Sequence, residues 1–183
     1  MMRKNPYSFG IKSICVGSNR VIKCINMSEN QMFCYQCEQT AKGTGCTTMG
    51  VCGKNPEVAT LQDVLIYVLR GISKLSLEIE KIGVENEKTN VFVSEALFAT
   101  LTNTNFDPNS IVNYIKKAAN IKKQLYNKLQ VAGQKIETMD NSINFELEQT
   151  KEGLISQGKL FGINSDPKID PDLHSLQWLL LMD

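Results

Sequence analysis

The sequence predicts a mainly α-helical chain in which a cysteine-rich loop, residues 32–54, precedes a three-helix bundle, residues 55–133. Four cysteines lie together in a segment rich in Gly and Thr, and such a segment suits a loop around an inorganic core. Further along, apolar residues recur at spacings of three and four, as on one face of a helix. We find no convincing alternation typical of a strand, and 183 residues suffice for one domain with a hydrophobic core.

Residues 1–31 form an extension with five basic residues against one acid, Glu29. No long apolar stretch or cleavage site indicates a secretory signal. We favour a mis-called start, with translation beginning at Met32 or Met27, over an organellar presequence. The first interpretation predicts a cytoplasmic protein and the second an organellar one. We interpret Cys15 and Cys24, which lie in this extension, as incidental rather than as ligands.

The first predicted helix follows Pro56 and ends near Gly83, which is a plausible helix stop. Thr60 and Asp63 indicate a capping box at its start. Its apolar stripe comprises Leu61, Val64, Leu65, Val68, Ile72, Leu75, Ile79 and Ile82.

Two further helices complete the predicted bundle. The second is expected from about 91 to 102, with Phe92, Ala96, Leu97 and Leu101 inward. The third follows Asp107 as N-cap and Pro108 as first helical residue, and it ends near Gly133. Its apolar face comprises Ile111, Ile115, Ala118, Leu125 and Leu129. Short loops between these helices predict an antiparallel bundle.

Residues 134–172 read as a connector in which a short helix, interrupted by Gly153, is expected over 142–157. Residues 175–181 resemble residues 60–66, so we interpret 173–183 as the start of a second helical bundle, truncated at the end of the chain. The apolar run 178–182 would drive aggregation if exposed. His174, the single histidine, is expected at the surface or at a helix cap.

The candidate metal ligands have the spacing C-x2-C-x8-C-x5-C and are Cys34, Cys37, Cys46 and Cys52. Clustered thiolates bind iron–sulfur clusters or zinc. Zinc sites usually pair two short knuckles, and only Cys34 and Cys37 form one here, so the spacing favours iron–sulfur and leaves zinc, or no metal, as alternatives. The loop glycines are expected to adopt unusual backbone angles, and Lys42 and Lys54 are expected to face solvent rather than balance cluster charge.

The loop resembles the opening of hybrid-cluster proteins, the hydroxylamine reductase (prismane) family. The shared pieces are Met-Phe-Cys-x-Gln-Cys at 32–37, Thr-Ala-Lys at 40–42, Thr-Gly-Cys at 44–46 and Cys-Gly-Lys at 52–54. The resemblance implies that Cys34, Cys37, Cys46 and Cys52 hold a [4Fe-4S] cluster, with [2Fe-2S] known from a subgroup. It covers about 150 residues of a family whose members are about three times longer.

The same resemblance implies reduction of hydroxylamine to ammonia and water, or of nitric oxide, at a second, hybrid iron–sulfur–oxygen cluster in downstream domains. No cysteine follows Cys52, so this chain alone is expected to be inactive. We expect it to be an N-terminal electron-transfer part that receives electrons from a donor protein and needs the missing downstream domains. The alternatives are a zinc-binding structural module and a small ferredoxin-like carrier. A net charge of +1 favours neither nucleic acid nor membrane as a partner.

Overall fold

The computed structural model describes part of the chain in detail. The described residues are 13–16, 23–26, 32–37, 39–43, 45–101, 103–134, 136, 141–161, 173 and 176. Contacts divide the chain into two units, residues 1–31 and 32–183, and each is described by itself.

The first unit contains a two-stranded antiparallel sheet. Strands β1 (Ser13–Val16) and β2 (Lys23–Asn26) pair so that Cys15 lies opposite Cys24 in the register. Sequence analysis predicted no strand, so this hairpin is an addition to the predicted fold.

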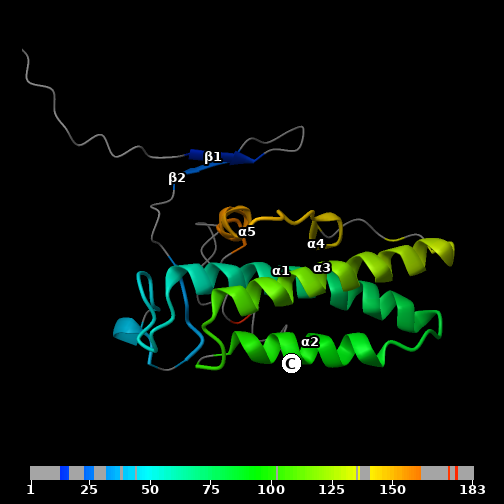
Figure 1. Cartoon of the computed structure of the whole chain (residues 1–183), viewed down its shortest axis with the longest axis horizontal. Helices are drawn as coiled ribbons and strands as arrows, with labels where there is room; N and C mark the ends of the chain where they lie inside the picture. Colours follow the sequence, from blue (N-terminus) through cyan, green and yellow to red (C-terminus); the bar gives the residue numbers. More distant parts are fainter. Residues whose placement is uncertain are drawn as a thin grey trace, which may run out of the picture. The chain divides into compact units, whose positions relative to one another are not determined.

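The second unit is helical, and the predicted mainly α fold is confirmed (Figure 1). Its bundle consists of α1 (Pro56–Lys81), α2 (Glu87–Thr100) and α3 (Pro108–Val131). Successive helices run in opposite directions, as predicted, so α1 and α3 point the same way. Two short helices, α4 (Asn141–Asn144) and α5 (Lys151–Gly158), pack against α1.

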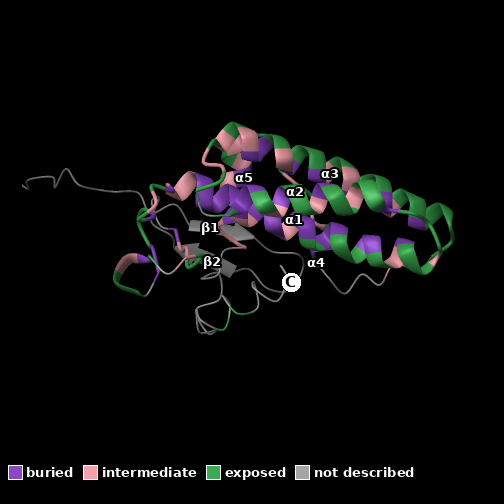
Figure 2. Cartoon of the chain, turned by 90° about the horizontal axis from the view of Figure 1, so that it is seen from below, coloured by how far each residue is buried: buried purple, intermediate pink, exposed green. Residues whose placement is uncertain are grey.

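The core lies between the helices, and Figure 2 shows the buried residues along their inner faces. Every predicted stripe residue of α1 is buried except Ile82, which is half-buried at the end of the helix. All five residues predicted for the apolar face of α3 are buried as well. Helical periodicity therefore identified the α1–α3 interface correctly, because both helices have one apolar and one polar side.

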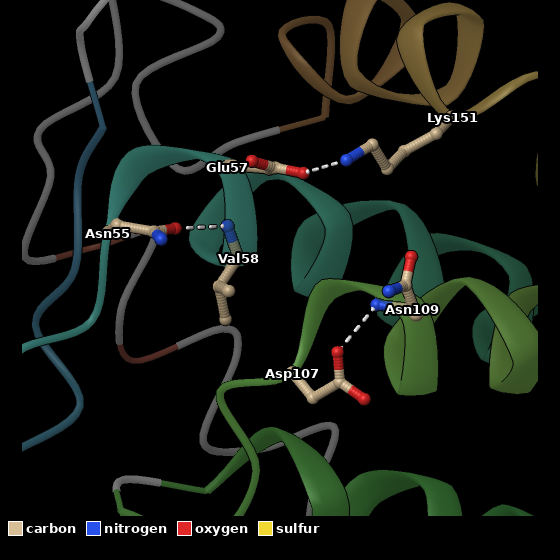
Figure 3. Close-up of polar contacts among 6 residues, drawn as sticks. All are labelled: Asn55, Glu57, Val58, Asp107, Asn109 and Lys151. Atoms are coloured by element: carbon tan, nitrogen blue, oxygen red, sulfur yellow. Dashed lines mark hydrogen bonds and ion pairs between the residues drawn. The ribbon is translucent and has the colours of Figure 1, made fainter.

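The start of α1 differs from the predicted capping box. Asn55 is the N-cap, and its side-chain oxygen accepts a hydrogen bond from the N–H of Val58 at 2.8 Å (Figure 3). Pro56 occupies the first helical turn, where the missing N–H of proline costs nothing. The Thr60 hydroxyl instead donates to the Pro56 carbonyl at 2.8 Å. The capping box was wrong because Asn-Pro starts the helix one turn earlier.

The predicted ends of α3 are confirmed. The Asp107 carboxylate accepts a hydrogen bond from the N–H of Asn109 at 3.0 Å (Figure 3). It accepts a second from the N–H of Ser110 at 3.3 Å. Gly133 follows the helix with φ +70°, a left-handed conformation that glycine adopts without strain.

Helix α2 begins four residues before its predicted start. Phe92 and Ala96 are buried and Leu97 is half-buried, as predicted, but Leu101 is 39% exposed. The prediction that Leu101 faces inward is wrong, because the helix ends at Thr100 and the chain becomes extended at Leu101.

The segment after α3 also differs from the prediction of one helix over 142–157. Residues 145–150 separate α4 from α5, and Gly153 lies inside α5 rather than interrupting a helix. The Lys122 ammonium donates to the carbonyls of Ser142 at 3.0 Å and Phe145 at 2.6 Å, so these contacts fix α4 against α3. Helix α5 is joined to the first turn of α1 by an ion pair of 2.7 Å between Lys151 and Glu57 (Figure 3).

Several predictions fall largely outside the described residues. Of 173–183, only Leu173 and Leu176 are described, both helical and both 55% exposed. His174 and the apolar run 178–182 lie outside the described residues. A search of the described helices finds none that is both long and apolar enough to cross a membrane.

Candidate metal centre

The loop of residues 32–54 lies at the end of the bundle where α1 begins (Figure 1). Its two arms are paired: Cys34 and Cys46 exchange backbone hydrogen bonds of 3.0 and 2.9 Å. A further bond of 3.0 Å runs from the Met32 N–H to the Thr47 carbonyl. This short ladder brings together two predicted ligands that are twelve positions apart in the sequence.

Tight turns shape the loop between the cysteines. Gly43, Gly45 and Gly53 have positive φ, which confirms the unusual backbone angles expected for them, whereas Gly50 does not. At Gly45 a side chain is excluded for a second reason, because a Cβ atom would lie 2.6 Å from the Phe33 ring. The aromatic ring thus packs directly on the backbone beside Cys46.

The loop packs onto α1 through a small apolar cluster. Met32 and Cys46 from the loop are buried with Ala59 of α1, and Cys34 and Ala41 pack against them. Cys46 is only 4% exposed. The other three predicted ligands are half-buried, so the thiols lie in an environment from which water is partly excluded.

Polar groups of the loop point at the cysteine sulfurs. The Ala41 N–H donates to Sγ of Cys46 at 3.5 Å, and the Lys54 ammonium lies 3.9 Å from Sγ of Cys34. Such N–H···S contacts surround iron–sulfur clusters and tune their potential.

The thiols of Cys34, Cys46 and Cys52 are close enough to interact electrostatically. Burial raises the pKa of the Cys34 thiol, the Lys54 charge and a backbone hydrogen bond from Gln36 lower it, and the other two thiols raise it further. A buried thiolate among other thiolates is unfavourable unless a positive group neutralises it. The donor set therefore fits a cationic iron–sulfur core, which would supply that charge.

Among the described residues, which include all four loop cysteines, no three Cys, His, Asp or Glu side chains form a group able to hold one metal ion. A zinc site needs all its sulfurs at about 2.3 Å from one point. The thiolates of a cluster bind separate irons and can stand further apart.

Lys54 was predicted to face solvent, and this prediction is wrong. Its side chain is 1% exposed, and its ammonium donates to Oε1 of Gln36 at 2.7 Å. Lys42 is exposed, as predicted. Lys54 directly precedes the N-cap of α1 and its ammonium contacts Gln36 and Cys34, whereas Lys42 lies on the turn Ala41–Gly43 and is exposed.

Comparison with known proteins decides the family. The Prismane/CO dehydrogenase family matches residues 32–182. The chain belongs to this family. Its prismane relatives include proteins named hydroxylamine reductase from Syntrophobacter fumaroxidans, 49% identical over 150 residues, and Methanocella arvoryzae, 46% identical over 151 residues. Each of these two alignments covers 82% of this chain and 28% of the relative.

A third prismane relative, the hydroxylamine reductase of Parabacteroides distasonis, is 51% identical over 102 residues, which are 56% of this chain and 19% of the relative. The resemblance stated from the loop motifs is thus confirmed at the level of the family. The chain spans less than a third of the length of these relatives.

Sequence analysis missed one half-buried acid on α1 that interacts electrostatically with Lys54 of the cysteine loop. Asp63, which was expected to cap α1, lies in its second turn, and burial raises its pKa to about 8, while the Lys54 charge acts in the opposite direction. The pattern that placed Asp63 near a helix start contained no signal of its burial, which depends on how the loop covers α1.

This raised pKa predicts a pH-dependent stability. Between about pH 4 and pH 8 the folded chain retains a proton on Asp63 that the unfolded chain has lost, so the free energy of unfolding falls as pH rises through this interval. Asp63→Asn should remove this decrease and be more stable than the wild type at pH 8. Urea unfolding followed by far-UV circular dichroism at pH 5 and pH 8 measures both effects.

The matched control for this experiment is Glu95→Gln, which neutralises an exposed acid on α2. It should keep the pH dependence of the wild type. An Asp63→Asn variant whose stability falls with pH as steeply as that of the wild type would contradict the prediction.

Proposed function

We propose that the loop of residues 32–54 binds a [4Fe-4S] cluster and that this chain is the N-terminal, electron-transferring part of a hydroxylamine reductase. The proposed ligands are Cys34, Cys37, Cys46 and Cys52. The observation that carries the proposal is the pairing of Cys34 with Cys46 in a half-buried loop whose sulfurs face N–H donors. The names of the prismane relatives support the choice of reaction.

When bound, the cluster supplies a store for one electron at a time. The residues of this chain hold and shield it: the cysteines provide thiolates, and Met32 with Ala59 covers the buried side at Cys46. The Ala41 N–H and the Lys54 ammonium offset negative charge on the sulfurs. A redox protein is the proposed electron donor, and a reducing compartment such as the cytoplasm suits free thiols.

For the whole protein we propose that hydroxylamine takes up two electrons and two protons and yields ammonia and water, with nitric oxide as an alternative substrate. The second, hybrid cluster that this requires draws cysteine ligands from downstream domains, and residues 53–183 contain no cysteine. The purified 183-residue chain should therefore not turn over hydroxylamine above the rate of free iron–sulfide. An anaerobic assay of hydroxylamine consumption tests this, and sustained turnover would contradict it.

Metal analysis tests the cluster itself. After anaerobic reconstitution we expect about four iron and four acid-labile sulfide per chain and a brown protein. About two of each would instead indicate [2Fe-2S]. A colourless protein that takes up one zinc and no iron under the same conditions would replace this proposal with a zinc-binding structural module.

A further inference from the structure

Lys54 is a buried cation placed directly at the cysteine loop. Its side chain is 1% exposed, and its ammonium lies 2.7 Å from Oε1 of Gln36 and 3.9 Å from Sγ of Cys34. The face of the Phe106 ring lies 5.9 Å away on another side. Burial of an ammonium is unfavourable unless negative charge is nearby.

The described partners of Lys54 do not provide full neutralisation. Gln36 offers a neutral amide oxygen and Phe106 an aromatic face. Within the described part of the chain, no carboxylate forms an ion pair with Lys54 at 4.0 Å or less, and Asp63 acts on it only through a longer electrostatic interaction. The Cys34 thiol, 3.9 Å from the ammonium, becomes a negative thiolate when it binds metal.

The backbone fixes this cation in place. The Gly50 N–H donates to the Lys54 carbonyl at 2.7 Å, and the Gly53 N–H donates to the Gly50 carbonyl at 2.8 Å. A Cβ on Gly50 would lie 3.1 Å from both Sγ of Cys52 and Cβ of Lys54. The turn therefore places Lys54 and one predicted ligand, Cys52, on either side of Gly50, while the Lys54 ammonium reaches a second ligand, Cys34, twenty positions earlier.

We propose that Lys54 is a positioning residue that sets the reduction potential of the cluster held by the loop, an inference that rests on the proposed function. A four-thiolate cluster has net negative charge, and reduction adds one electron without a bond being formed or broken. A fixed positive charge 3.9 Å from a ligand sulfur stabilises the added electron. Because water is excluded from the Lys54 side chain, its charge is screened less than that of a surface lysine.

Lys42 provides a matched control in the same loop. It has the same charge but is exposed, on the turn Ala41–Gly43. Lys42→Met therefore removes an exposed positive charge from the loop and leaves the buried charge of Lys54 in place. A comparison of Lys54→Met with Lys42→Met separates the effect of position from the effect of net charge.

The experiment is a redox titration of the anaerobically reconstituted chain, with dithionite as reductant and the paramagnetic reduced cluster measured by electron paramagnetic resonance. Lys54→Met should lower the equilibrium constant for one-electron reduction about tenfold, which is a potential about 59 mV more negative. Lys54→Arg, which retains the charge, should remain near the wild type, and so should Lys42→Met.

Iron and sulfide content, measured first, separates the two proposals. A wild-type chain without a cluster would overturn the proposed function. Lys54→Met with wild-type iron content and an unchanged potential would overturn the role of Lys54 alone. If Lys54→Met does not retain iron, Lys54→Gln, which keeps a polar head group, takes its place, and a wild-type potential in that variant overturns the inference equally.

Discussion

Cys46→Ser should abolish cluster binding, with iron and acid-labile sulfide per chain falling at least about tenfold after anaerobic reconstitution. Cys46 is the most buried of the four loop cysteines, and its Sγ already accepts the Ala41 N–H at 3.5 Å. A serine oxygen is a harder ligand than a thiolate and suits iron–sulfur clusters poorly. Iron, sulfide and visible absorption measure the loss directly.

The matched control is Cys24→Ser. Cys24 lies in β2, in the unit of residues 1–31, outside the loop. The Cys24→Ser variant should bind as much iron as the wild type, because we interpret Cys24 as a residue that is not a cluster ligand. Both variants should keep the far-UV circular dichroism of a helical chain, because the bundle core lies among α1, α2 and α3. Wild-type iron content in Cys46→Ser would refute Cys46 as a ligand.

The predicted ligands could be found from sequence because their signal is local. Residue type and spacing within 32–54 suffice to indicate a thiolate site. The burial of Lys54 could not be found in this way. It depends on contacts with Cys34 and Gln36, about twenty positions earlier, and on the turn at Gly50. The local sequence around a lysine beside a cysteine motif does not show whether its side chain faces water or a cysteine sulfur.

The helices were predictable to the extent that their faces differ in polarity. Helices α1 and α3 separate apolar from polar residues, so periodicity located both interfaces. Helix α2 exposes Val91 and Phe98 while burying Phe92 and Ala96, and this distribution left its limits poorly defined. The strands β1 and β2 have four residues each, too few for an alternating pattern to stand out.

The bundle should be the stabilising element of the unit of residues 32–183, and Leu65→Ala tests this. Leu65 is fully buried in α1, so its truncation should lower the free energy of unfolding by about 2–5 kcal/mol. That is a large part of the roughly 5–15 kcal/mol typical of a domain. The control Leu77→Ala makes the same change on the same helix at a site that is 59% exposed, where about 0.5 kcal/mol is expected. Urea unfolding followed by far-UV circular dichroism measures both.

The same pair of variants shows whether the loop depends on the bundle. The loop packs on α1 through Met32, Cys46 and Ala59, and α1 begins at Pro56, directly after the loop. Unfolding of α1 removes this support, so cluster absorption and helicity should be lost at the same urea concentration. Leu65→Ala should move both transitions together to lower urea, and Leu77→Ala should move neither. Loss of helicity with the cluster retained would instead mean that the cysteine loop holds its iron without the bundle.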